Sequence, residues 1–234
     1  MIVNRELLMN AFLSIPTPVS AWCYRIAKRY INKDERAADF EHAFQMVRAE
    51  GIPGDYLEFG VYRGASFITA FEQIRKFGLN DMQLFAFDSF EGLPHGEAAV
   101  FEQGDYFCPE PLFCKIITKA GVDMNRVSII SGLYDQTLVQ AIKPQYGLTR
   151  AAIVQIDCDL YTSTKCVLHF IKDLVGRGTV LFFDDWNAFG SQSEEHGECK
   201  AFGEWSLRPL FDELSMRRRD GPSKGFIMNR DLNE

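Results

Sequence analysis

Four aspartates stand at the ends of two apolar segments, and carboxylates in such a pattern are able to hold a cation. They are Asp157, Asp159, Asp184 and Asp185. Gathered at one edge of a sheet, they would repel one another unless protons or cations intervene, and hard oxygen ligands suit Mg²⁺, Ca²⁺ or Mn²⁺. The pattern therefore predicts a divalent-cation site. The alternative is that the aspartates only cap the helix expected after residue 162 and form the turn expected after residue 185.

The spacing limits which of the four aspartates can share one ion. Asp157 and Asp159 are two positions apart. In an extended chain they point to one side about 7 Å apart, which is too wide for a tight chelate. Asp184 and Asp185 lie at an expected strand-to-loop bend, where both can turn inward. We therefore expect one aspartate of the first pair and both of the second to bind the ion.

A glycine-containing turn follows the first strand-like segment and has the composition of a ligand cradle. It reads Glu58-Phe-Gly60-Val-Tyr-Arg-Gly64. Gly60 allows a sharp turn and a close approach of the backbone to a ligand, and Gly64 opens the next helix, where unpaired N–H groups can hold a carboxylate. The turn is neither the GxGxxG of dinucleotide sites nor a P-loop. A plain tight strand-to-helix turn is the alternative interpretation.

Two further strand ends carry polar or glycine residues. Asp88 ends the second strand-like segment, where an acid in a nucleoside-binding α/β fold accepts hydrogen bonds from ribose hydroxyls. Its alternative role is to cap the turn over residues 89–94. Ser131 and Gly132 end the third segment. Ligands of open parallel sheets bind beyond the carboxyl ends of the strands, so acids or glycines at all five ends predict a ligand site at that edge.

The elements that must position these residues alternate along the chain. Apolar strand-like segments cover residues 56–60, 82–88, 126–131, 151–157 and 178–184. Nearly continuous apolar character is typical of strands covered on both faces. Two more strands, around 214–219 and 225–230, form a predicted hairpin, and residues 1–50 are predicted to be helical. The expected result is an α/β fold with an open, mostly parallel sheet and helices on both faces.

Composition narrows the class of partner. The 234 residues carry a net charge of −7 and no long basic run, so a nucleic-acid partner is not expected. The longest early apolar stretch is too short to cross a membrane and is not preceded by the basic segment of a signal peptide, so no membrane partner is expected. Six scattered cysteines without a CxxC pair favour reduced thiols. We expect a cytoplasmic protein with a small-molecule site.

Four segments together resemble the macrocin O-methyltransferase family, the TylF-, MycF- and NovP-like enzymes that modify natural products. They are YLEFGVYRGAS (56–66), FDSFEGLP (87–94), QIDCDLYTST (155–164) and FDDW (183–186). The resemblance implies a Rossmann-like class I methyltransferase fold, with a mostly parallel seven-stranded sheet and a C-terminal antiparallel hairpin. It also implies an N-terminal helical cap over residues 1–50 and an S-adenosylmethionine-binding domain over residues 51–234.

The same resemblance implies a cofactor, a metal and an acceptor. The residues expected to hold S-adenosylmethionine are Glu58, Gly60, Tyr62, Gly64, Ser66, Asp88, Ser131, Gly132 and Asp157. Mg²⁺ or another divalent cation is expected on Asp157, Asp184 and Asp185. Family members commonly methylate a sugar hydroxyl of a glycosylated small molecule. Related proteins suggest a homo-oligomer, a dimer or higher.

The expected chemistry is in-line transfer of a methyl group from a sulfonium to a hydroxyl oxygen. A bound cation lowers the pKa of the alcohol and orients it, with Asp157 as both ligand and general base. His95 and His196, on expected rim loops, are candidates for substrate contact. Two alternatives stay open. One is a nucleotide-sugar glycosyltransferase that uses Asp157-Cys-Asp159 as a DxD metal motif, and the other is a non-catalytic cofactor-binding protein.

Overall fold

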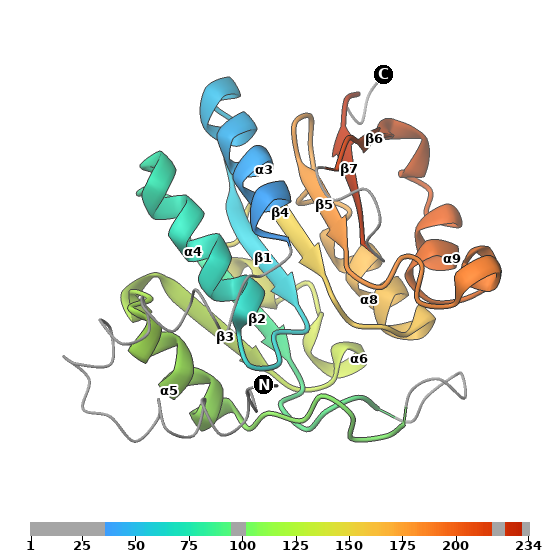
Figure 1. Ribbon diagram of the computed structural model, residues 1–234, viewed down its shortest axis with the longest axis horizontal. Helices are drawn as coiled ribbons and strands as arrows, with labels where there is room; N and C mark the ends of the chain where they lie inside the picture. The colour runs from blue at the N-terminus through green and yellow to red at the C-terminus, as the bar shows by residue number, and fades with distance from the viewer. Residues whose placement is uncertain (1–35, 95–101, 217–222, 231–234) are drawn as a thin grey trace, which may run out of the picture.

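Seven strands form one mixed sheet in the computed structural model, which describes residues 36–94, 102–216 and 223–230 (Figure 1). The strands are β1 (Asp55–Phe59), β2 (Leu84–Asp88), β3 (Val127–Ser131), β4 (Ala151–Ile156), β5 (Val180–Phe183), β6 (Phe211–Leu214) and β7 (Lys224–Met228). Their order across the sheet is β3-β2-β1-β4-β5-β7-β6. Strands β1 to β5 run parallel, and β7 is antiparallel to both β5 and β6. The predicted sheet with its C-terminal antiparallel hairpin is confirmed, but the first strand of the hairpin covers residues 211–214 and not the predicted 214–219.

Helices cover both faces of this sheet (Figure 1). They are α3 (Ala37–Glu50), α4 (Ala65–Phe77), α5 (Glu110–Ala120), α6 (Tyr134–Thr137), α7 (Ile142–Gln145), α8 (Tyr161–Ile171) and α9 (Gly197–Gly203), with 3₁₀ turns η1 (Met124–Arg126), η2 (Gly190–Glu195) and η3 (Arg208–Leu210). Phe40, Phe67 and Phe113, from α3, α4 and α5, belong to one buried cluster. Val167 and Phe202, from α8 and α9, belong to another cluster.

Strand β1 shows why the centre of the sheet is apolar on both sides. Tyr56 belongs to the cluster beneath α3 and α4, whereas Leu57 and Phe59 belong to the cluster beneath α8. Successive side chains of a strand point to opposite faces, so a strand covered by helices on both sides is apolar at nearly every position. Glu58 is the exception among the buried residues of β1. It is fully buried, so its carboxylate needs hydrogen-bond donors within the protein.

The strand order reverses at β1, which has β2 on one side and β4 on the other. Phe59, at its end, pairs with Phe87 of β2 and with Ile156 of β4. Loops leave such a point in opposite directions and open a crevice, in which ligands of open α/β sheets bind. The fold therefore places the loops after β1, β2 and β4 around one crevice.

Helix α3 is the part of the predicted N-terminal cap that the structure describes. Its Phe40 is buried in the cluster that contains Tyr56 and Phe182, so the helix is part of the core of the sheet domain. Residues 1–35 and His95 lie outside the described residues, and the predicted domain division at residue 50 stays a prediction. No helix in the described ranges has the length and apolar character that crossing a bilayer requires. The cysteines in these ranges are free thiols.

Candidate active site

A cavity of about 420 Å³ opens at the carboxyl ends of the parallel strands. The loops after β1, β2, β3, β4 and β5 all contribute to its wall. The lining residues that the sequence predicted are Gly60, Tyr62, Asp88, Gly132, Asp157, Asp184 and Asp185. The predicted residues that do not line it themselves are Glu58, Gly64, Ser66 and Ser131. The structure thus brings the glycine turn and the acidic residues to one cavity.

The turn after β1 depends on a glycine at position 60. Gly60 has a φ of +86°, and a Cβ atom there would lie 1.8 Å from the main-chain oxygen of Asp157. Any side chain would therefore collide with the backbone at the end of β4. The N–H of Gly60 also donates to the carbonyl oxygen of Phe87 at 2.9 Å. The turn is consequently held against both neighbouring strands. The absence of a side chain at Gly60 lets the turn lie directly against the main chain of Asp157.

Glu58 and Ser66 form a buried pair that anchors this turn. The Oε1 atom of Glu58 accepts a hydrogen bond from the Ser66 hydroxyl on α4, and its Oε2 atom accepts one from the Tyr56 hydroxyl at 2.5 Å. The carboxylate therefore ties β1 to the first turn of α4. Direct contact of these two side chains with the cofactor stays a prediction.

Asp88 holds the same turn from the end of β2. Its Oδ2 atom accepts hydrogen bonds from the backbone N–H groups of Val61 at 2.8 Å and Tyr62 at 3.2 Å. Its Oδ1 atom accepts one from the N–H of Phe90 at 2.7 Å. The carboxylate also lines the cavity. Ionised carboxylates offer about four acceptor positions, so a ribose hydroxyl can bind in addition, and that role stays a prediction.

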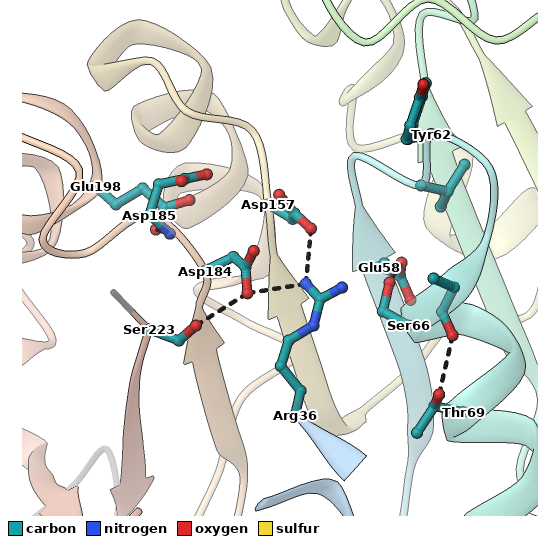
Figure 2. A network of polar contacts seen from close by, with 12 residues as sticks. Arg36, Glu58, Tyr62, Ser66, Thr69, Asp157, Asp184, Asp185, Glu198 and Ser223 are labelled. Atoms are coloured by element: carbon teal, nitrogen blue, oxygen red, sulfur yellow. Dashed lines mark hydrogen bonds and ion pairs between the residues drawn. The ribbon is translucent and has the colours of Figure 1, made fainter. Parts of the chain in front are cut away.

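Three aspartates meet at the wall that faces the glycine turn (Figure 2). Asp157, Asp184 and Asp185 each present one carboxylate oxygen within 4.8 Å of the others. Burial and then the charge of Asp184 raise the pKa of Asp157 well above its usual range, whereas the charge of Arg36 lowers it. Burial and the charge of Asp159 raise the pKa of Asp185 to about 8. Close carboxylates that resist ionisation fit a hard divalent cation, which supplies compensating positive charge.

Asp159 lines the cavity but makes a different contact. It has a φ of +59°, which is uncommon for a residue other than glycine, and its side chain hydrogen-bonds with that of Asp185. Two carboxyl groups hydrogen-bond only when a proton lies between them. Burial is the main reason why the pKa of Asp159 rises to about 7. Of the pair two positions apart, it is therefore Asp157 that groups with Asp184 and Asp185.

Two residues that sequence reasoning did not single out contact this acidic wall (Figure 2). Arg36 Nη1 lies 3.0 Å from Asp157 Oδ2 and 2.8 Å from Asp184 Oδ1. Glu198, 1% exposed, accepts a hydrogen bond from the N–H of Asp185 through Oε2 at 2.9 Å, while its Oε1 has no hydrogen-bond partner in the described part of the chain. Burial raises the pKa of Glu198 well above its ordinary value. The packing of α3 and α9 brings Arg36 and Glu198 to the acidic wall, so their spacing in the sequence does not predict these contacts.

An aromatic rim completes the cavity. Tyr62 and Tyr106 meet edge to face with ring centroids 5.8 Å apart, and Tyr134 of α6 also lines the cavity. Tyr106 and Tyr134 could not be selected from the sequence, because single aromatic residues are common in cores. His196, a candidate for substrate contact, lines a second cavity of about 210 Å³, where its ring lies 5.2 Å from that of Phe189.

The strand order, the glycine turn after β1 and the acid at the end of β2 define the fold of the class I methyltransferases. The calicheamicin methyltransferase CalS11 has this fold, with a TM-score of 0.74, 18% identity and coverage of 97% of this chain and 91% of that one. The fold class predicted from the sequence is confirmed. More narrowly, the chain belongs to the Macrocin-O-methyltransferase (TylF) family, which it matches over residues 25–201.

Two curated relatives show how far the similarity reaches. The 8-demethyl-8-(2,3-dimethoxy-alpha-L-rhamnosyl)-tetracenomycin-C 4'-O-methyltransferase of Streptomyces olivaceus is 27% identical over 162 residues, 65% of this chain and 60% of that protein. The mycinamicin III 3''-O-methyltransferase of Micromonospora griseorubida is 25% identical over 164 residues, 65% of this chain and 63% of that protein. The chain thus spans about three fifths of the length of these relatives.

Proposed function

We propose that the protein is an S-adenosylmethionine-dependent O-methyltransferase that uses a divalent cation and acts on a sugar hydroxyl of a small-molecule glycoside. The observation that carries this proposal is the cavity, in which a glycine turn and three aspartates face one space. Membership of the family supports transfer to oxygen. A sugar acceptor is supported by the name of the first relative, which contains a rhamnosyl group.

The glycine-turn side of the cavity is the proposed place of S-adenosylmethionine. Gly60 lines this side of the cavity, and Asp88 has acceptor positions left for ribose hydroxyls. Gly132, beside α6, lines the same space. The predicted cytoplasmic location and homo-oligomeric state are part of this proposal.

Asp157 is the proposed general base. Its main chain abuts Gly60 and its side chain belongs to the aspartate group, so it lies where the two sides of the cavity meet. A divalent cation on Asp157, Asp184 and Asp185 supplies Lewis acidity that makes an alcohol more acidic. With cation and cofactor both bound, Asp157 would take the hydroxyl proton while the oxygen bonded to the methyl carbon and the carbon–sulfur bond broke, which would leave S-adenosylhomocysteine.

Calorimetric titration with S-adenosylhomocysteine, once with Mg²⁺ and once with EDTA, tests the cofactor part of the proposal. We expect micromolar affinity, on the order of −8 kcal/mol. A nucleoside diphosphate sugar is the matched control ligand, because a glycosyltransferase with a DxD motif would bind it instead. Failure of S-adenosylhomocysteine to bind in both conditions rejects the proposal. Transfer assays on glycosylated acceptors, with Mg²⁺ or EDTA, then test the cation and the acceptor class.

A further inference from the structure

Arg36 precedes α3 and reaches the acidic wall of the cavity (Figure 2). A single nitrogen, Nη1, contacts Asp157 Oδ2 at 3.0 Å and Asp184 Oδ1 at 2.8 Å. Asp184 Oδ1 also accepts a hydrogen bond from the Ser223 hydroxyl at 3.0 Å. The Arg36 side chain is 19% exposed, and those of Asp157 and Asp184 are 27% and 24% exposed. Water and salt therefore screen this contact less than they screen an ion pair on the open surface.

Core packing fixes the position from which Arg36 reaches the acids. Phe40, one helical turn later, is 1% exposed and stacks on Phe182 of β5 with ring centroids 5.2 Å apart. Residues four apart lie on the same side of a helix, so the side that carries Phe40 also directs Arg36 towards the end of β5. Asp184 follows Phe182 by two positions at that end. Arg36 is consequently a fixed component of the acidic wall.

We propose that Arg36 is the protein's own counter-cation for Asp157 and Asp184, and that a divalent ion binding these carboxylates must displace the guanidinium from at least one of them. This inference rests on the cation site of the proposed function. Nη1 lies between the two carboxylates and contacts one oxygen of each, so an ion that bridged the same oxygens would need the same space. Two cations at that point would also repel each other.

Two consequences follow for the ion affinity and the stability of the protein. Because the guanidinium competes for the same oxygens, Arg36 weakens binding of a divalent ion. Because it neutralises part of the charge on the acids, Arg36 also stabilises the protein when no divalent ion is available. Removal of the Arg36 charge should therefore change the two properties in opposite directions, which a residue that merely supports the fold would not do.

The Arg36→Gln variant tests this opposition because glutamine keeps hydrogen-bond donors and loses the charge. We expect it to bind Mn²⁺ about 10-fold more tightly than the wild-type protein does, as judged from the electron paramagnetic resonance signal of free Mn²⁺ during titration. We also expect a lower midpoint of thermal unfolding in EDTA. Arg48→Gln is the matched control. Arg48 lies exposed on the same helix, about 18 Å along its axis, so neither quantity should change.

Mn²⁺ binding by Arg36→Gln that equals or falls below wild-type binding would overturn the proposal, since Arg36 would then position the aspartates for the ion. Loss of Mn²⁺ binding in both proteins would overturn it as well, because no ion would compete with the arginine. The binding of S-adenosylhomocysteine still tests the methyltransferase proposal separately in that case. If Arg36→Gln does not fold, Arg36→Met serves instead. Methionine keeps an unbranched apolar stem and carries no charge, so the Mn²⁺ affinity of this variant should exceed that of the wild type, and a lower affinity would be decisive against competition.

Discussion

The carboxylates on the two sides of the cavity have opposite surroundings. On the glycine-turn side, Glu58 and Asp88 accept hydrogen bonds from hydroxyl and backbone N–H groups of the chain. On the acidic side, Asp157 and Asp185 lie partly buried among other carboxylates, with raised pKa values, and the donor to Asp157 is the charged side chain of Arg36. One oxygen of Glu198 has no partner in the described part of the chain. An acid for which the chain supplies donors shapes the site, whereas an acid crowded by other acids is available to a proton or a cation.

Asp157→Asn, which changes the acidic side of the cavity, should have the largest effect on the protein. The change removes the proton acceptor and one anionic ligand oxygen but keeps the shape of the side chain. We expect turnover to fall by about 1,000-fold while affinity for S-adenosylhomocysteine changes by less than about threefold. Methyl transfer from labelled cofactor and calorimetry measure the two quantities, and Asp81→Asn, at an exposed position, is the control. Unchanged turnover would reject Asp157 as the base.

Gly60→Ala tests the point at which the two sides touch. The new methyl group would lie 1.8 Å from the Asp157 carbonyl oxygen, so we expect a loss of about 3 kcal/mol or more in the free energy of unfolding by urea. Gly78→Ala is a matched control, since Gly78 also has positive φ, +65°, but within the described residues no atom beyond its own chain neighbours and helix backbone lies within 4 Å of the Cβ position. It should lose only about 1 to 2 kcal/mol. Equal losses would mean that the turn relaxes away from β4 at little cost.

Asp88→Asn tests whether the glycine-turn side is held by its carboxylate. The amide keeps one acceptor oxygen but turns an NH₂ group towards backbone N–H groups that now donate to Asp88. We expect a loss of about 2 kcal/mol in the free energy of unfolding, together with weaker binding of S-adenosylhomocysteine. Chemical denaturation and calorimetry measure both. A variant with wild-type stability would show that the turn does not need this clamp.

Asp185→Asn should have the smallest effect and the opposite sign. The pKa of Asp185 is about 8 in the folded protein and about 4 in an unfolded chain, so its contribution to stability is greatest below pH 4 and falls as the pH rises to 8. Asparagine does not ionise, so the variant does not lose this contribution to stability as the pH rises. Its amide can also donate a hydrogen bond to Asp159. In EDTA at pH 8.5 we expect the variant to be more stable by about 1 kcal/mol. A gain that is the same at pH 4 would refute this explanation.

The fold could be predicted because the apolar strand segments, and the acidic or glycine residues at their ends, are recognisable in the sequence. Continuous apolar segments gave the parallel strands, and the acids after β4 and β5 gave the group formed by Asp157, Asp184 and Asp185. Arg36 and Glu198 escaped prediction because helix packing, not spacing, brings them to the aspartates. The place of Glu58 beside α4 also went unpredicted, although its position inside a buried strand was a usable signal.

The pairing of β1 with β4 has a consequence for the order in which the molecule assembles. This pairing joins Tyr56 to Ile153, and β2, β3 and the helices between them separate the two residues along the chain. Closing so long a segment costs more chain entropy than forming a local helix or turn. The cavity lies across this pair of strands, so neither half offers a complete binding surface until the two meet. We expect a refolding chain to acquire most of its helices first and its capacity to hold a ligand last.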